Sequence, residues 1–265
     1  MKTRLITALI MIALCVVVLI FSHNPLVMSG VVALVIAGGI YELFGATGFR
    51  KKKIPAIILN VILPFVVFFE IPAYKFILLG AFVLAIVLFG YFMVNVKRLE
   101  KINDFQSVVI SFLIAFLLKS VPALRLHGGL LLLIVAVLVG VMTDTGAYIC
   151  GRLFGKHKLA PTLSPKKTIE GAIGGIVFAV VTVLGVLFAV GQSENIWVVV
   201  IYSLFGSVIS QFGDLALSSI KRIAKIKDYG NLFPGHGGFL DRFDSLMFVI
   251  PYTYLFLIVA AYAAM

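Results

Sequence analysis

Long apolar runs alternate along the chain with short breaks that carry charge, proline or glycine. A helix that crosses a bilayer needs about 20 apolar residues. Nine runs approach or exceed that length, at residues 5–22, 26–46, 54–69, 73–95, 105–121, 128–150, 169–191, 196–218 and 244–264. Pro64 lies inside the third run and predicts a kink there. The pattern predicts an all-α, polytopic integral membrane protein with about nine transmembrane helices and no extra-membrane domain.

Composition supports a membrane protein and excludes a soluble globular one. Of the 265 residues, 62% are hydrophobic and only 12% are charged, which is too little polar surface for a water-soluble fold. The first run follows Lys2 and Arg4 and lacks a small-x-small cleavage site, so we interpret it as a retained span. Cys15 and Cys150 have no metal-ligand spacing and are interpreted as packing residues.

The distribution of basic residues predicts the orientation of the chain. With the N-terminus inside, 19 of the 22 Lys and Arg residues fall in inside segments, and only Lys75, Lys119 and Arg125 fall outside. The positive-inside rule therefore favours a cytosolic N-terminus and an external C-terminus. The inside basic residues are spread over five short segments. The net charge of +11 therefore indicates topology and attraction to membrane lipid, and we expect no nucleic-acid partner.

Acidic residues divide the chain into two regions. Six of the eleven lie in or beside the two largest inside segments, namely Asp144, Glu170, Asp214, Asp228, Asp241 and Asp244. Acids at membrane depth are costly and usually functional. We therefore distinguish residues 1–127, with about five spans, from a catalytic region at 128–265, with about four spans and two cytosolic motif loops.

The first motif loop follows the sixth run. Asp144, Tyr148 and Arg152 are spaced by four and share one face if the helix continues. Beyond them the seventh run opens with Ser164, Lys166, Lys167, Thr168 and Glu170. A helix N-terminus beside lysines is a natural anion site. A positive-inside loop with a simple helix cap explains the same residues, and this alternative stays open.

The second motif loop follows the eighth run. Gln211, Asp214, Ser218 and Lys221 form one helical stripe, and we expect the helix to continue through Arg222 and Lys225. A glycine-rich stretch then carries His236, Gly237 and Gly238, where the backbone can approach a ligand closely. Asp241 and Asp244 lie one helical turn apart at the start of the ninth run.

This combination of side chains suits phosphate chemistry. Carboxylates bind Mg²⁺, Mg²⁺ bridges phosphate oxygens, and Lys and Arg neutralise the transferring group. Asp241 and Asp244 have an alternative role as helix caps, but capping does not explain Asp214 near a helix C-terminus. His236 is either a general base or a positioning residue, and a phosphate-monoester nucleophile is already anionic and needs no base.

These motifs resemble those of the phosphatidate cytidylyltransferase (CDP-diacylglycerol synthase) family. The matching positions in the second loop are Ser218, Ile220, Lys221, Arg222, Lys227, Asp228, Gly230, Phe233, Pro234, His236, Gly237, Gly238, Phe239, Asp241, Arg242, Phe243 and Asp244. The first loop resembles the family's second block. The resemblance covers about residues 140–246 and is weak over the first 127.

The resemblance implies the reaction of CTP with phosphatidic acid to give CDP-diacylglycerol and pyrophosphate. It also implies Mg²⁺ with a second cation (K⁺ or another Mg²⁺), a homodimer, and membrane lipid around the protein. We expect an enzyme of the bacterial cytoplasmic (inner) membrane. Its site would lie on the cytosolic face, where both motif loops fall and CTP is found.

Carried over by position, the resemblance assigns the metal centre to Asp214 and Asp241, with Asp144 and Asp244 next. The catalytic group is Ser218, Lys221, Arg222, Lys227, Asp228, His236, Arg242 and Asp244. The substrate-binding group is Asp144, Tyr148, Arg152, Ser164, Lys166, Lys167, Thr168, Glu170, Gly237 and Gly238.

Two other functions are compatible with part of the pattern. A CTP-dependent polyprenol or phytol kinase would attack the γ-phosphorus and release CDP, but the complete second loop favours the cytidylyltransferase. A membrane transporter would be expected to carry acids near mid-membrane and two repeats of broken helices. Here the acids gather at one face and no repeat is visible.

Overall fold

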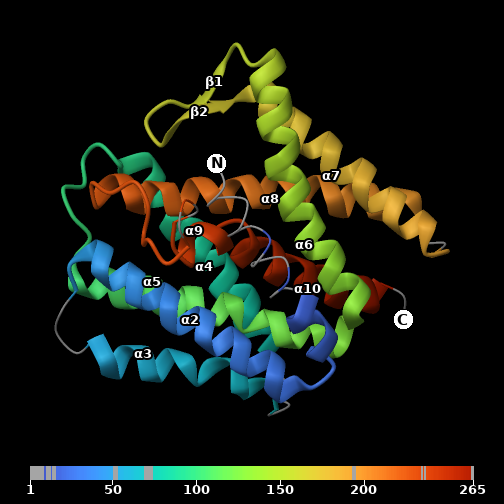
Figure 1. Cartoon of the computed structure of the whole chain (residues 1–265), viewed down its shortest axis with the longest axis horizontal. Coiled ribbons are helices and arrows are strands. Elements are labelled where there is room, and N and C mark those ends of the chain that lie inside the picture. Colours follow the sequence, from blue (N-terminus) through green and yellow to red (C-terminus); the bar gives the residue numbers. More distant parts are fainter. Residues whose placement is uncertain are drawn as a thin grey trace.

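The computed structural model describes residues 9, 13, 16–49, 53–68, 74–192, 195–233, 235 and 237–263 (Figure 1). Its elements are α2 (Pro25–Thr47), α3 (Lys53–Val61), η1 (Leu63–Phe68), α4 (Tyr74–Asn95), α5 (Asp104–Leu118), α6 (Ser120–Phe154), β1 (Lys158–Ala160), β2 (Ser164–Thr168), α7 (Ile169–Ala189), α8 (Ile196–Ile223), α9 (Leu240–Phe243) and α10 (Leu246–Ala263).

The predicted helical membrane fold is confirmed in its main features. Five helical stretches among the described residues are long and apolar enough to cross a membrane, at 25–47, 74–95, 104–154, 169–189 and 196–223. Shorter apolar helices lie at 54–65 and 246–261. Most of the first predicted run lies outside the described residues, although 16–21 are helical. The chain is therefore an integral membrane protein built from helices.

Several predicted boundaries need correction. The third run is a helix only to Val61 and continues as the 3₁₀ helix η1 around Pro64, because proline lacks the N–H of an α-helical turn. No loop separates the fifth and sixth runs, since α6 begins at Ser120. Instead, α6 is broken at Gly129, whose φ of 78° is accessible to glycine. The helix of the ninth run, α10, begins at Leu246, and a separate short helix, α9, precedes the run.

Helix α8 extends beyond its predicted run but stops before Lys225. Lys225 has a φ of 57°, and the N–H of Ile226 donates to the Lys221 carbonyl at 2.9 Å. This left-handed residue followed by a 6→1 bond is a Schellman ending. The prediction that the helix continues through Lys225 is therefore wrong, and the ending turns the chain toward the glycine-rich loop.

Helix α8 crosses the middle of the molecule in Figure 1, where α6 passes over it, and the layer formed by α2, α3 and α5 lies below. Aromatic side chains fill the core on one side of α8. Phe248 of α10 packs edge-on against Phe89 of α4 and Phe212 of α8, with ring centroids 5.6 and 5.5 Å apart. Edge-to-face packing of buried rings adds to the stabilisation from their burial.

Helices α6 and α7 lie unusually close together at the end that carries the antiparallel hairpin β1–β2 (Figure 1). A Cβ added at Gly146 would overlap Phe178, and one added at Gly174 would overlap Cys150. Small residues allow membrane helices to approach backbone to backbone. The hairpin, which the all-α prediction did not include, connects these two helices.

Candidate active site

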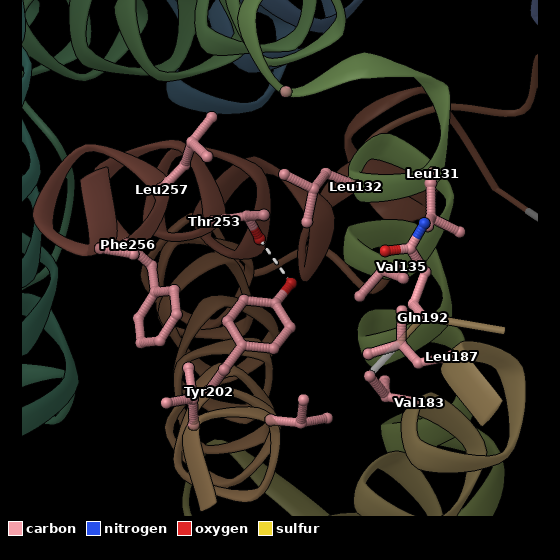
Figure 2. Close-up of a pocket in the computed structure, with 14 residues that line it drawn as sticks. Leu131, Leu132, Val135, Val183, Leu187, Gln192, Tyr202, Thr253, Phe256 and Leu257 are labelled. Atoms are coloured by element: carbon pink, nitrogen blue, oxygen red, sulfur yellow. Dashed lines mark hydrogen bonds between the residues drawn. The ribbon is translucent and has the colours of Figure 1, made fainter. Parts of the chain in front are cut away.

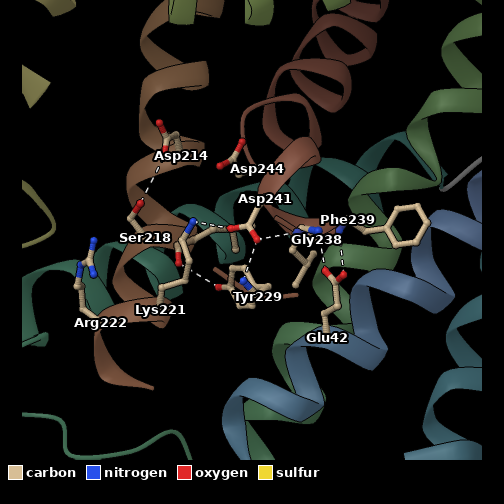
Figure 3. Close-up of polar contacts among 12 residues, drawn as sticks. Glu42, Asp214, Ser218, Lys221, Arg222, Tyr229, Gly238, Phe239, Asp241 and Asp244 are labelled. Atoms are coloured by element: carbon tan, nitrogen blue, oxygen red, sulfur yellow. Dashed lines mark hydrogen bonds and ion pairs between the residues drawn. The ribbon is translucent and has the colours of Figure 1, made fainter. Parts of the chain in front are cut away.

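Asp241, at the start of α9, connects three segments of the second motif loop (Figure 3). Its Oδ1 accepts a hydrogen bond from Lys221 Nζ at 2.8 Å. Its Oδ2 accepts hydrogen bonds from the backbone N–H groups of Tyr229 at 2.8 Å and Gly238 at 3.0 Å. Asp241 is 7% exposed and Lys221 is 9% exposed. A buried charge needs this degree of pairing, so Asp241 organises the loop around the end of α8.

The side chain of Tyr229 also contacts this network. Its hydroxyl donates to the Leu217 carbonyl oxygen at 3.0 Å, and its ring centroid lies 5.5 Å from Lys221 Nζ. Burial, and next the charge of Asp241, raise the pKa of the Tyr229 phenol well above its ordinary value. The hydroxyl therefore stays protonated and remains a donor.

Two glycines shape the loop next to Asp241. Gly237 has a φ of 85°, and Phe233 donates from its N–H to the Gly237 carbonyl oxygen at 2.9 Å. A Cβ at Gly237 would also press on the Asp241 carboxylate. The glycine turn therefore packs closely against this carboxylate, and its predicted approach to a ligand stays a prediction. His236 lies outside the described residues, and its role stays a prediction.

Glu42 of α2 belongs to this site and was not predicted from the sequence. Its carboxylate accepts hydrogen bonds from the N–H groups of Phe239 at 3.0 Å and Leu240 at 3.1 Å (Figure 3). It therefore caps α9 from a different helix, since Phe239 offers no side-chain cap. The one available sequence signal was an acid inside an apolar run.

A second cluster, the carboxylate cluster, consists of Asp144 on α6, Asp214 on α8 and Asp244 after α9. Their charges interact with one another, and Figure 3 shows Asp214 and Asp244 side by side. Ser245 bridges two members, because its hydroxyl donates to Asp144 at 3.2 Å and its N–H donates to Asp244 at 2.9 Å. Three acids from distant parts of the sequence thus share one region.

Lys167 of β2 supplies the opposing charge. Its Nζ lies 2.5 Å from Asp214 Oδ2, and both side chains remain about one quarter exposed, at 23% and 24%. Ser218 donates to Asp214 Oδ1 at 3.3 Å. The predicted stripe on α8 is therefore confirmed as a face that meets both the hairpin and the α9 region.

The carboxylate cluster has the donor chemistry of a magnesium site. Carboxylate oxygens are hard ligands, and the Lys167 ammonium group already occupies the place of a cation beside Asp214. No three His, Cys, Asp or Glu side chains in the described part of the chain converge tightly enough to enclose a metal by themselves. Mg²⁺ usually binds one or two carboxylates and completes its shell with water and substrate phosphates, so the residues fit such an ion.

The hairpin is attached to the site by polar contacts. Arg222 Nε donates to the Leu163 carbonyl at 2.9 Å. Thr168 caps α7 by accepting from the Gly171 N–H at 3.1 Å. The Glu170 carboxylate accepts the Lys156 N–H at 3.0 Å and contacts His157 Nδ1 at 2.6 Å. Thr168 and Glu170 therefore stabilise the hairpin, which carries Lys167 toward Asp214.

Other predicted residues lie around this centre without joining it. Tyr148 and Arg152 share an exposed face of α6, as predicted, with 3.3 Å between the hydroxyl and a guanidinium nitrogen. Lys166, Lys227, Asp228 and Arg242 are also exposed, and Ser164 is half-buried. Arg242 is close enough to interact with the charge of Asp144. These side chains are available to a ligand, and their roles stay predictions.

A cavity among the described residues is separate from both clusters. It has a volume of about 430 Å³ and lies between α6, α7, α8 and α10 (Figure 2). Its lining is apolar apart from Gln192 and the pair Tyr202 and Thr253, whose hydroxyls are 2.8 Å apart. With no charged residue in its lining, this cavity is unsuited to a phosphate group.

Fold and site together define a helical membrane protein whose carboxylates, ammonium groups and glycine turn gather at one end of α8. Comparison with known proteins gives the family. The Cytidylyltransferase family model matches residues 2–260, and the chain belongs to that family.

Curated relatives agree with this family assignment. The chain is 50% identical over 130 residues to a phosphatidate cytidylyltransferase of Staphylococcus haemolyticus. It is 47% and 48% identical over 130 residues to proteins of the same name from Staphylococcus aureus (strain COL) and Staphylococcus epidermidis (strain RP62A). Each alignment covers 49% of this chain and 50% of the relative. The chain thus matches about half the length of these relatives.

Proposed function

We propose that the chain is a phosphatidate cytidylyltransferase. A phosphatidic acid oxygen forms a bond to the α-phosphorus of CTP, the bond from that phosphorus to the β-phosphate oxygen breaks, and pyrophosphate leaves. The product is CDP-diacylglycerol. The observation that carries this proposal is the convergence of Asp144, Asp214 and Asp244 with Lys167 beside the Lys221–Asp241 network, in a chain of the Cytidylyltransferase family.

In this reaction the protein positions and neutralises phosphate groups. Lys167 is partly exposed beside Asp214 and can move to a phosphate oxygen. Arg222 and Arg242 are exposed and supply further positive charge. The phosphatidic acid nucleophile is already anionic near neutral pH, so the transfer requires no side-chain base. Such transfers depend mainly on alignment and charge stabilisation.

One or two carboxylates of the cluster would bind Mg²⁺, with Asp214 first and Asp144 and Asp244 next. When bound, the ion supplies Lewis-acid stabilisation of phosphate oxygens. A second cation, K⁺ or another Mg²⁺, belongs to the same proposal. The Asp241 carboxylate already accepts three hydrogen bonds. Its assignment as a metal ligand therefore stays a prediction that requires part of this network to exchange.

The proposal also includes the orientation and assembly of the protein. Nine spans with a cytosolic N-terminus and an external C-terminus would place the site at the cytosolic face of a bacterial inner membrane. The family resemblance adds a homodimer. Reporter fusions at each terminus test the orientation, and the mass of the detergent-solubilised protein tests the dimer. If a reporter that functions only in the cytosol is active when fused to the C-terminus, the nine-span topology is contradicted.

The reaction is tested with CTP labelled at either end of its triphosphate. Purified protein in mixed micelles receives phosphatidic acid, Mg²⁺ and CTP carrying ³²P at the α or the γ position. The proposed activity transfers the α label into lipid and leaves the γ label in pyrophosphate. A polyprenol or phytol kinase would instead move only the γ label into its lipid acceptor. Absence of lipid-linked α label with every divalent cation tried would refute the assignment.

A further inference from the structure

Glu42 connects the N-terminal half of the chain to the candidate active site. It lies on α2, almost 200 residues before the loop that it contacts. Its two carboxylate oxygens each accept one backbone N–H, from Phe239 and from Leu240. Hydrogen bonds from backbone N–H groups to a carboxylate are stronger than neutral ones. The position of α9 therefore depends on a side chain from a separate helix.

The surface of α2 around Glu42 is shaped to receive this loop. A Cβ at Gly38 would overlap the Phe239 ring, and a Cβ at Gly39 would lie 3.0 Å from Leu240 Cδ2. On the loop side, Gly230 and Gly238 leave space for the Glu42 carboxylate, because a Cβ at either one would overlap it. Glycines on both surfaces thus permit the close approach that the two hydrogen bonds require.

We propose that Glu42 is a positioning residue for the reaction, an inference that rests on the proposed function. Glu42 fixes the Phe239 and Leu240 N–H groups, and the next residue, Asp241, binds Lys221 at 2.8 Å and Gly238 N–H at 3.0 Å. The chain of contacts runs from α2 through the loop to the ammonium group. Glu42 acts through the glycine turn and Lys221 without contacting CTP.

The first test compares Glu42→Ala with Glu42→Gln in the full-length protein. A misplacement of about 1 Å can lower turnover on the order of 100-fold, and we expect a loss in kcat/KM of about that size for Glu42→Ala. KM for CTP should rise while kcat falls, because a displaced glycine loop would bind the nucleotide less well in both the ground state and the transition state. Gln retains one acceptor oxygen and should restore part of the loss. Glu100→Gln, at an exposed loop position, is the matched control.

The second test changes the shape of α2 and leaves its charge unaltered. Gly38→Ala should raise KM for CTP because the added methyl group displaces Phe239. Gly45→Ala is the matched control on the same helix, since its Cβ would meet nothing within 4 Å. Thermal unfolding of each purified variant gives the folded fraction, which corrects kcat for any lost protein.

The outcomes separate positioning from general stabilisation and from failure of the proposed function. A stabilising role alone would lower the folded fraction and leave KM for CTP unchanged after correction, which would overturn the inference. Equal KM values for Gly38→Ala and Gly45→Ala would also contradict it. If the wild-type protein makes no lipid-linked cytidine product, the proposed function fails, and the inference about Glu42 fails with it. An active wild type with a wild-type-like Glu42→Ala refutes the inference alone.

Discussion

Two lysine–aspartate ion pairs lie in this site, and their surroundings differ. Lys221 and Asp241 are buried, and the carboxylate also accepts two backbone N–H groups. Lys167 and Asp214 are each about one quarter exposed, and the carboxylate otherwise accepts only a serine hydroxyl among the described residues. The first pair is therefore enclosed by other residues of the chain. The second lies where a ligand can reach it.

This difference assigns different tasks to two pairs of the same chemical type. Breaking a buried pair leaves a charge without a partner in a poorly solvated place, whereas breaking an exposed pair changes stability little. The Lys221–Asp241 pair therefore stabilises the glycine loop. In the proposed reaction, the Lys167–Asp214 pair would open and free a carboxylate for Mg²⁺ and an ammonium group for phosphate.

The largest effect is expected from breaking the buried pair with Asp241→Asn. Loss of one partner of a buried pair costs about 3–5 kcal/mol, so the thermal unfolding midpoint should fall and turnover should be lost. The matched variant combines Asp241→Asn with Lys221→Met. Removing both charges should recover most of the stability but none of the activity. Undiminished turnover in Asp241→Asn would remove this residue from the site.

Asp214→Asn should affect metal dependence more than stability. Its partner is partly exposed, so we expect the free energy of unfolding to change by less than about 1 kcal/mol. Even indirect partners of a metal contribute about 10–100-fold in affinity, so the Mg²⁺ concentration for half-maximal activity should rise more than about 100-fold. Asp104→Asn, an exposed aspartate at the start of α5, is the control. An unchanged Mg²⁺ titration would exclude Asp214 as a ligand.

Lys167→Met tests the other half of the exposed pair. We expect kcat to fall on the order of 100-fold, as for loss of one group that stabilises transition-state charge. Stability should stay within about 1 kcal/mol of the wild type. Lys101→Met, at an exposed loop position, controls for a lost positive charge. If kcat is unchanged, Lys167 serves only to attach the hairpin to α8.

Helical periodicity in the sequence was sufficient to predict which residues of the site share a helix face. Asp214, Ser218 and Lys221 share a face because helical residues three or four apart are neighbours, and α8 confirms that stripe. Asp144, Tyr148 and Arg152 follow the same rule on α6. The helical membrane fold was likewise predictable, because apolar run length is a strong constraint in a bilayer.

Contacts between distant segments could not be predicted by such rules. Sequence spacing does not indicate that Lys167 meets Asp214, because that contact depends on how the hairpin folds back over α8. Glu42 reaches Phe239 only because Gly38 and Gly39 allow α2 close to the loop. Tertiary packing also determines that the ion pair of Asp241 is buried and that of Asp214 is partly exposed.

The smallest effect that still distinguishes the two pairs is expected from Ser218→Ala. Its hydroxyl donates to Asp214 Oδ1 at 3.3 Å, and one hydrogen bond contributes about 1 kcal/mol, or about fivefold in affinity. We therefore expect the Mg²⁺ requirement to shift by up to about fivefold, with kcat nearly unchanged. The adjacent Ser219 is a close control, because its buried hydroxyl donates to the Ala216 carbonyl of its own helix. Equal Mg²⁺ titrations for Ser218→Ala and Ser219→Ala would show that the Ser218 hydroxyl does not orient Asp214. The ion pair with Lys167 would then be the contact that orients this carboxylate.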